Sequence, residues 1–146
     1  MEKPVLLVVE DNTVNQMVVR ALAERYGYEV IAVKSAREAL GLLERQERRF
    51  SAILMDVNMP IMNGIECTMA IRELEAEQEW RTPIIGVSAH SAESCRRQCL
   101  AAGMDDYLSK PFDPNVFRNT LSQWIPRSEM QHLRDFHSSE NGRESA

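Results

Sequence analysis

No hydrophobic run in this sequence is long enough to enter a membrane. The apolar run nearest the N-terminus, Val5–Val9, is too short for the core of a signal peptide or for a transmembrane helix. Basic residues are also in the minority: 17 lysines and arginines against 22 acids give a formal net charge of −5, whereas general nucleic-acid binding needs a basic face. We therefore expect a cytoplasmic protein, or the cytoplasmic side of a membrane-anchored one, with no nucleic-acid partner and no direct membrane contact.

Cysteine is scarce, and its spacing excludes a disulfide framework. Cys67, Cys95 and Cys99 are odd in number and contain no CxxC pair, which fits a reducing compartment. Cys95 and Cys99 lie four apart on a predicted helix, and a metal site shared with His90 is one interpretation. Free cysteine more often packs as a small hydrophobic residue, so we expect packing.

The length and composition fit one folded domain. The 146 residues are 44% hydrophobic and 27% charged, enough for one core but not for two. We place the domain at residues 1–126. Residues 127–146 form a polar tail in which Met130, Leu133 and Phe136 are spaced three apart, so a short helix is possible there, but a frayed tail is the expectation.

Short apolar runs alternate with helical patterns along the chain. Unalternating runs of this kind are typical of strands that are covered on both faces. The expected strands are Val5–Val9, Val30–Val33, Ala52–Met55, Ile84–Val87 and Tyr107–Leu108. A helix after each strand gives a β-α alternation, and right-handed crossovers make this an α/β doubly wound parallel sheet with five helices.

Helix boundaries can be predicted from capping residues. We expect capping boxes at Thr13 with Gln16 and at Ser35 with Glu38, a left-handed residue at Gly103, and a last helix capped by Asp113 before Pro114. The first helix should stop near Gly27. The expected inward faces are Val14, Met17, Val18, Ala21 and Leu22 on the first helix and Val116, Phe117, Leu121 and Trp124 on the last.

Polar residues follow four of the apolar runs at the point where each strand should end. They are Glu10 with Asp11, Asp56, Ser88 and Lys110. In an open α/β sheet, ligands bind in the crevice outside the carboxyl ends of the strands. If the strands are parallel neighbours, three acids, a hydroxyl and an ammonium converge there, and the acids form the oxygen set that Mg²⁺ prefers.

These residues carry a family resemblance. The phrases are Val9-Glu10-Asp11-Asn12, Met55-Asp56-Val57-Asn58-Met59-Pro60, Met62-Asn63-Gly64, Ser88, Ala102-Gly103-Met104-Asp105-Asp106-Tyr107 and Lys110-Pro111. In this order, from about Pro4 to Ile125, the chain resembles the response regulator receiver domain. That family has the flavodoxin-like fold with strand order 2-1-3-4-5, and it takes a phosphoryl group from a phosphohistidine onto an aspartate.

The resemblance implies a role for each site residue. Asp56 is the phosphoacceptor, Lys110 pairs with it, and Ser88 donates to a phosphoryl oxygen and so lets the switch residue Tyr107 rotate. A cis bond before Pro111 is also implied. Mg²⁺, with Mn²⁺ as a substitute, would be bound by Asp11, Asp56 and the backbone carbonyl of Asn58, with Glu10 acting through water. Asn58 and His90 bracket the path of an attacking water and would tune the phosphoryl lifetime.

The resemblance also implies a phosphoacceptor signalling domain rather than an enzyme. Its partners would be a histidine kinase, a histidine phosphotransfer domain, or both, with a weak dimer through the fourth helix, fifth strand and fifth helix. Glu10-Asp11-Asn12 with Val14-Asn15-Gln16 resembles the C-terminal receiver of a hybrid sensor histidine kinase, and a single-domain response regulator is the close alternative.

A second functional class is the aspartate-nucleophile phosphohydrolase of the haloacid dehalogenase type. These enzymes also combine an aspartate, a hydroxyl residue, a lysine and Mg²⁺. They place a second aspartate two residues after the nucleophile, where this chain has Asn58, so the sequence disfavours this interpretation.

Overall fold

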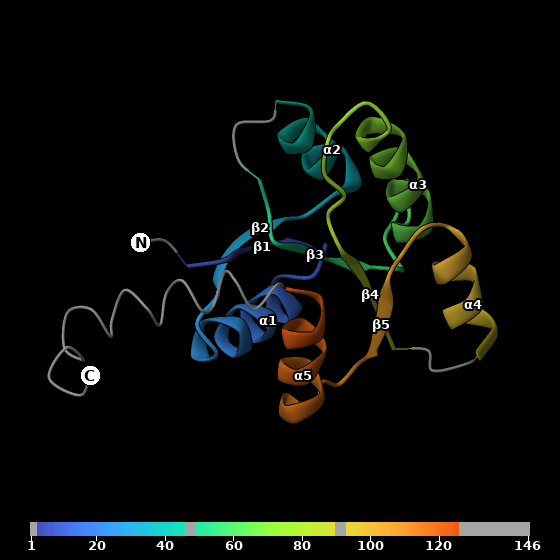
Figure 1. The fold of residues 1–146 in the computed structure, drawn as a ribbon. Coiled ribbons are helices and arrows are strands. Elements are labelled where there is room, and N and C mark those ends of the chain that lie inside the picture. The colour runs from blue at the N-terminus through green and yellow to red at the C-terminus, as the bar shows by residue number, and fades with distance from the viewer. Residues whose placement is uncertain (1–2, 46–48, 90–92, 126–146) are drawn as a thin grey trace, which may run out of the picture.

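Five parallel strands form the centre of the molecule (Figure 1). The structure is a computed structural model and describes residues 3–45, 49–89 and 93–125. The strands are β1 (Val5–Val9), β2 (Glu29–Val33), β3 (Ala52–Asp56), β4 (Ile84–Ser88) and β5 (Asp106–Ser109). Their order is β2-β1-β3-β4-β5, and every neighbouring pair is parallel. The predicted doubly wound sheet and its strand order are confirmed.

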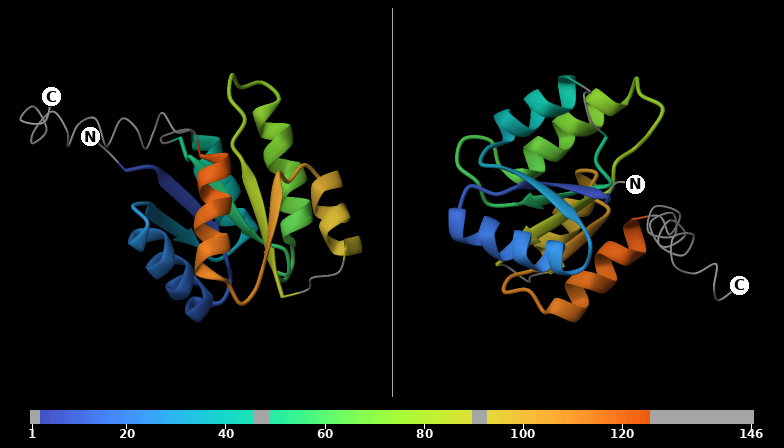
Figure 2. Two further views of the ribbon diagram at one scale, coloured as in Figure 1. Left: turned by 60° about the horizontal axis from the view of Figure 1, so that its bottom comes forward. Right: turned by 90° about the vertical axis from the view of Figure 1, so that its left-hand side faces the viewer.

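One helix follows each strand, and the helices cover both faces of the sheet (Figure 2). They are α1 (Thr13–Arg25), α2 (Ala36–Arg45), α3 (Gly64–Glu75), α4 (Glu93–Ala101) and α5 (Pro114–Trp124). One apolar core contains residues of α2, α3 and α4, and a second contains residues of α1 and α5. The sheet therefore separates two cores. No helix in the described part of the chain is long and apolar enough to cross a membrane.

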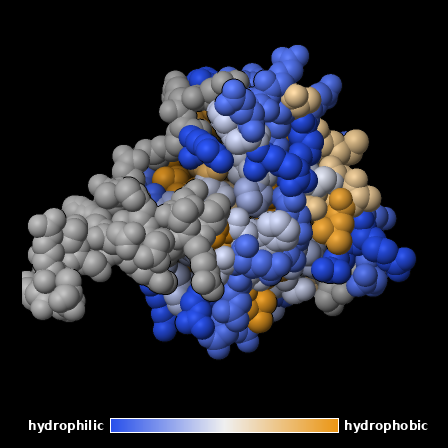
Figure 3. All heavy atoms as spheres, viewed as in Figure 1, coloured by the Kyte–Doolittle hydropathy of each residue, from blue (hydrophilic) through white to orange (hydrophobic). Residues whose placement is uncertain are grey.

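The strands are apolar on both faces because each face meets helices. In β1, Val5, Leu7 and Val9 belong to one core, whereas Leu6 and Val8 belong to the other. Fully burying a leucine or valine side chain stabilises the fold by roughly 1.5–3 kcal/mol. The outer surface visible in Figure 3 is mostly hydrophilic, with small apolar patches. The strands thus lack an alternation of apolar and polar residues because helices cover both faces of the sheet, as the sequence indicated.

The start of α1 differs from the predicted capping box. The helix begins at Thr13, and Asn12 is the cap, since its side chain accepts a hydrogen bond from the amide of Asn15 at 3.0 Å. Gln16 is consequently one position too far along to complete a box. Its side-chain amide donates instead to the carbonyl oxygens of Glu10 at 2.7 Å and Val33 at 3.0 Å, which ties α1 to the ends of β1 and β2.

Most of the inward face predicted for α1 was also wrong, although Leu22 packs, partly buried, against the core as expected. Val14 and Met17 are each 65% exposed and Val18 is 45% exposed, whereas Val19 and Ala23 are buried against the sheet. The helix carries two apolar stripes, and periodicity alone does not say which one meets the sheet. The outer stripe of Val14, Met17 and Val18 is left uncovered by the described residues.

Other helix ends follow the prediction more closely. Ser35 accepts from the amide of Glu38 at 3.1 Å, although Glu38 reaches back to the amide of Lys34 rather than to Ser35. Asp113 caps α5 ahead of Pro114, and Gly27 and Gly103 have left-handed φ values of 95° and 116°. On α5, Phe117 and Leu121 are buried as expected and Trp124 is partly buried, but Val116 is 51% exposed.

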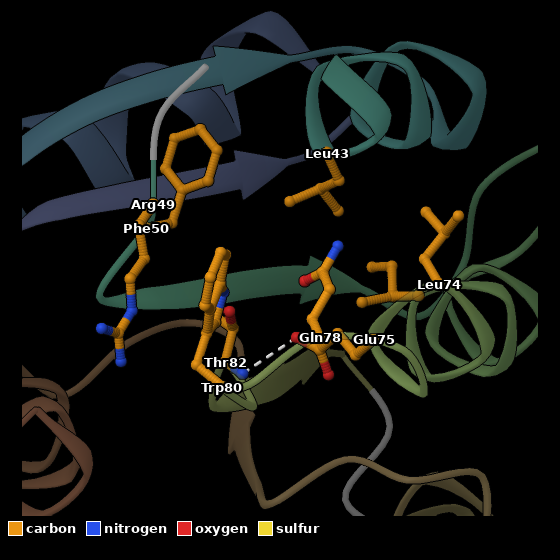
Figure 4. A pocket seen from close by; sticks show the side chains of 9 residues that line it. Leu43, Arg49, Phe50, Leu74, Glu75, Gln78, Trp80 and Thr82 are labelled. Carbon is orange, nitrogen blue, oxygen red and sulfur yellow. Dashed lines mark hydrogen bonds between the residues drawn. The ribbon is translucent and has the colours of Figure 1, made fainter. Parts of the chain in front are cut away.

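A small pocket lies at the amino ends of β3 and β4, away from the polar strand ends (Figure 4). Its lining includes Phe50, which precedes β3, and Thr82, which precedes β4. The guanidinium of Arg49 stacks 5.3 Å from the centre of the Trp80 ring, and Glu75 accepts from the amide of Thr82 at 2.9 Å. These contacts close that end of the core.

Candidate functional site

The strand ends bring the predicted polar residues together. Met55 lies beside Val9, and Asp56 lies beside Val87 in the register of the sheet, so the carboxyl ends of β1, β3 and β4 are level. Lys110 follows β5, and its Nζ atom lies 2.9 Å from Glu10 Oε1 and 3.7 Å from Asp56 Oδ1. The bond between Lys110 and Pro111 is cis, as the resemblance implied.

Three carboxylates form a compact oxygen cluster. One ligand oxygen from each of Glu10, Asp11 and Asp56 can be chosen so that all lie within 4.8 Å of one another. Glu10 and Asp56 are buried, and Asp11 is exposed. Lys110 supplies one positive charge against three acids, so the cluster has an excess of negative charge. A hard divalent cation with several oxygen ligands fits that excess and that donor set.

The two buried carboxyl groups have pKa values that move apart. Burial raises the pKa of Asp56 to about 7, together with the hydrogen bond and the negative charge of Glu10. Lys110 and the amide of Asn58 act in the opposite direction. Burial also acts to raise the pKa of Glu10, but hydrogen bonds, above all from Lys110, outweigh it and hold that pKa below its ordinary value. In the absence of a cation, the pair therefore retains a proton at pH values below about 7, and Asp56 is the weaker acid of the two.

The loop after β3 holds both Asp56 and Asn58. The amide of Asn58 donates to Asp56 Oδ1 at 3.1 Å, and the Asn58 side chain donates to Ser88 Oγ at 3.1 Å. Gly64 lets α3 start directly against this loop, because a Cβ atom there would lie 2.3 Å from the backbone oxygen of Asp56. The Met62-Asn63-Gly64 phrase thus needs glycine at its last position, because the backbone of Asp56 comes too close to leave room for a side chain.

Tyr107 connects this site to α4. Its hydroxyl donates to Cys95 Sγ at 3.7 Å, and the Ser88 side chain also hydrogen-bonds the phenol. Burial is the main cause that raises the pKa of Tyr107; the Cys95 bond acts in the same direction and the Ser88 bond in the opposite one. Sequence analysis assigned Cys95 to packing and did not find this contact, because nothing in the spacing of residues 95 and 107 places them together.

The structure therefore gathers seven of the predicted site residues at one end of the sheet, while the role predicted for each of them stays a prediction. Glu10, Asp11, Asp56, Asn58, Ser88, Tyr107 and Lys110 all lie at or next to the carboxyl ends of the strands. His90 and the tail at 127–146 lie outside the described residues, and their predicted roles stay predictions. The proposed metal ligation through the Asn58 carbonyl likewise stays a prediction.

Comparisons with known proteins agree with this geometry. The profile of the response regulator receiver domain matches residues 6–122. The chain is 36% identical over 123 residues to hybrid signal transduction histidine kinase I of Dictyostelium discoideum, a match that covers 82% of this chain and 7% of that protein. It is 38% identical over 122 residues to the sensor protein GacS of Pseudomonas syringae pv. syringae, covering 83% of this chain and 13% of that protein. The chain thus spans a small part of these curated relatives.

Solved structures give the same result. The receiver domain of the sensor histidine kinase PA1611 from Pseudomonas aeruginosa, with a magnesium ion coordinated in its active-site cleft, is 37% identical with a TM-score of 0.73; the match covers 86% of this chain and 98% of that one. The receiver domain of Ssk1 from Saccharomyces cerevisiae, crystallised with the histidine phosphotransfer protein Ypd1, belongs to a match with a TM-score of 0.77 and 25% identity, covering 85% of this chain and 90% of that one.

Proposed function

The chain belongs to the response regulator receiver domain family of two-component and phosphorelay signalling, and we propose that Asp56 is its phosphoacceptor. The observation that carries this proposal is the position of Asp56. Its carboxylate ends β3, is 5% exposed, accepts the Asn58 amide at 3.1 Å and lies 3.7 Å from the Lys110 ammonium. This position at the carboxyl end of a central strand, within reach of two donors, supports the assignment.

The chemistry is a transfer between two nucleophiles. An oxygen of the Asp56 carboxylate attacks the phosphorus atom of a phosphohistidine, forming a P–O bond as the P–N bond breaks. The electron pair of that bond stays on the imidazole nitrogen, which then takes up a proton. Such transfers need little covalent help and depend on charge neutralisation and in-line positioning. In this proposal, Lys110 and Ser88 donate to phosphoryl oxygens, and the domain acts on its own phosphoryl group rather than on a series of substrates.

We infer that the cation of this site is Mg²⁺, with Mn²⁺ as a substitute. Asp11, Asp56 and the backbone carbonyl of Asn58 would hold it, and Glu10 would act through water. The acidic cluster and the magnesium-bound PA1611 receiver support this assignment. The ion would neutralise phosphoryl charge. Calorimetric titration with MgCl₂ should give weaker binding for Asp11→Asn than for the natural protein, and equal binding would remove Asp11 from the ligand set.

The phosphoryl donor is, in this proposal, a histidine kinase or a histidine phosphotransfer domain. The Ypd1 complex of the Ssk1 receiver and the histidine-kinase relatives support that class. The histidine-kinase relatives also support a receiver module within a hybrid kinase; its location on the cytoplasmic side of a membrane stays a prediction. The haloacid dehalogenase alternative receives no support from these relatives. Dimerisation through α4, β5 and α5 stays a prediction, which sedimentation with and without beryllofluoride would test.

The uncovered stripe on α1 supplies a docking face for that donor. Val14, Met17 and Val18 are exposed, and α1 begins directly after the acidic pair. A helical donor that brings a histidine to Asp56 would pack apolar side chains on this stripe, as amphipathic helices do in other complexes. Met17→Lys should slow transfer from a phosphorylated partner without slowing phosphorylation by acetyl phosphate.

The matched control for the docking face is Met69→Lys. Met69 is 58% exposed on α3, which covers the other face of the sheet, so a charge there should leave both reactions unchanged. The donor panel consists of purified histidine kinases and phosphotransfer domains carrying ³²P. If both variants lose transfer equally, or neither does, the α1 stripe is not the docking face.

The phosphoacceptor itself is tested by chemical mapping. The protein is incubated with acetyl phosphate and Mg²⁺, the acyl phosphate is trapped with borohydride, and the modified residue is located by mass spectrometry. Asp56 should carry the modification, and Asp56→Asn should abolish it. Modification at another acid, or undiminished labelling of the variant, would contradict the assignment.

A further inference from the structure

A chain of hydrogen bonds leads from the phosphoacceptor loop to α4. The Asn58 side chain donates to Ser88 Oγ at 3.1 Å, the Ser88 side chain hydrogen-bonds the phenol of Tyr107, and the phenol donates to Cys95 Sγ at 3.7 Å. Each oxygen in this chain can accept one bond and donate the next. The sulfur of Cys95 is therefore the acceptor by which this chain reaches α4, and it lies on a different element from the other three residues.

The ring of Tyr107 packs in a position that Gly86 and Met104 define. Gly86 of β4 lies under it, since a Cβ atom at that position would be 3.5 Å from Tyr107 Cδ2 and 2.5 Å from Met104 Sδ. The ring and Cys95 both pack, partly buried, against the core that contains Met104 and Cys99. The ring contacts supply packing at one end, and Cys95 supplies the hydrogen-bond acceptor at the hydroxyl.

We propose that Cys95 is a positioning residue for Tyr107: its sulfur accepts the phenol hydrogen, holds the ring beside Ser88 and so couples the state of the phosphoacceptor site to α4. The proposal rests on the proposed function, in which Ser88 is drawn to a phosphoryl group on Asp56. When Ser88 leaves the phenol, the hydrogen bond from the Tyr107 hydroxyl to Cys95 loses its support from that side. A thiol is a weak acceptor, so the remaining hold is slight and the ring can change position.

The same geometry makes the switch face sensitive to the chemistry of one thiol. Of the three cysteines in the chain, Cys67 and Cys99 are buried, whereas Cys95 is partly exposed. A covalent group on Cys95 would occupy the space that the phenol contacts. Tyr107 would then lose its acceptor without any change at Asp56.

The test compares the Tyr107 ring resonances of four proteins by NMR, each without ligand and with beryllofluoride and Mg²⁺. They are the natural protein, Cys95→Ala, Cys95→Ser and the control Cys67→Ala, which removes a buried sulfur from α3. Cys95→Ala should shift the ligand-free resonance toward its beryllofluoride position, because loss of one weak hydrogen bond changes such a population by about 2- to 10-fold. Cys95→Ser restores an acceptor and should return the resonance toward the natural value.

Three outcomes would overturn the proposal. They are an unmoved Tyr107 resonance in Cys95→Ala, an equal shift in Cys67→Ala, and a Cys95→Ser spectrum identical to that of Cys95→Ala. If Cys95→Ala does not fold, alkylation of the folded natural protein with iodoacetamide makes the same comparison. Failure of the phosphoacceptor assignment is distinguishable, because it would abolish the beryllofluoride response of the natural protein while leaving the ligand-free comparison intact.

Discussion

Replacing Gly64 by alanine should damage the phosphoacceptor loop through backbone contact alone. A Cβ atom at this position would lie 2.3 Å from the Asp56 backbone oxygen and 2.9 Å from Val57 Cα. Both neighbours are backbone atoms, so no side chain can rotate to relieve the overlap, and either β3 or the start of α3 must move. Overpacking of this kind typically destabilises a fold by about 1–3 kcal/mol.

Alanine also has an opposing effect, because it is a better helix former than glycine by roughly 0.5–1 kcal/mol in a helix interior. Gly64 is the first residue of α3, so most of that gain is absent and the overlap should dominate. Gly41 is the matched control. It lies within α2, and a Cβ atom added there would meet no atom within 4 Å beyond its own helix backbone and chain neighbours, so Gly41→Ala should stabilise the protein by about 0.5–1 kcal/mol.

Two measurements check this prediction. Urea denaturation gives the free energy of unfolding, which should fall for Gly64→Ala and rise for Gly41→Ala. Phosphorylation by acetyl phosphate should slow for Gly64→Ala only, because the displaced backbone carries Asp56. A Gly64→Ala protein with natural stability and natural phosphorylation rate would refute the argument that close backbone approach fixes this glycine.

Three further predictions concern the site and the thiols. Lys110→Ala should slow phosphorylation of Asp56 by about 10²–10³-fold, the usual loss when one donor to a developing charge is removed, and an unchanged rate would exclude the lysine from the reaction. Burial raises the pKa values of Cys67 and Cys99 to about 11, so both stay protonated at pH 8; mass spectrometry should find iodoacetamide first at Cys95, which is partly exposed, with the buried thiols reacting only as the pH approaches 11. His90→Ala should change the decay rate of the acyl phosphate several-fold, roughly 1 kcal/mol in barrier. Equal decay rates of the natural protein and the variant between pH 6 and 8 would show that His90 has no part in the decay.

The sheet and the site were predictable because short-range sequence features specify them. Apolar runs that end in polar residues indicate buried parallel strands, and level strand ends bring those polar residues together. The positions of Asp56 and Lys110 at the strand ends could be predicted without knowing any contact between distant residues. The face of α1 was predicted wrongly because Val14 and Val19 belong to two different apolar stripes on one helix, and only the packing of the whole domain selects between them.

Long-range polar contacts were the part that the sequence did not reveal. Arg72 of α3 donates to the carbonyl oxygens of Thr82 and Gly103 and to the carboxylate of Asp105. Asp105 also accepts the guanidinium of Arg81. This network ties α3 to the starts of β4 and β5, yet its members are separated by up to 33 residues in the chain. The contact between Tyr107 and Cys95 escaped prediction for the same reason.

Lys110 forms the ion pair with Asp56 that the family resemblance implied, but Glu10 is its nearer partner, and this has a physical reason. The Lys110 ammonium lies 3.7 Å from Asp56 and hydrogen-bonds Glu10 at 2.9 Å. Glutamate reaches one methylene farther than aspartate, which carries its carboxylate to the ammonium. When both carboxyl groups are ionised, at an effective dielectric constant of about 20, these two distances differ in Coulomb energy by only about 1 kcal/mol. Adding the charge of a phosphoryl group on Asp56 would reverse a preference this small, so we expect Lys110 to move from Glu10 toward that group.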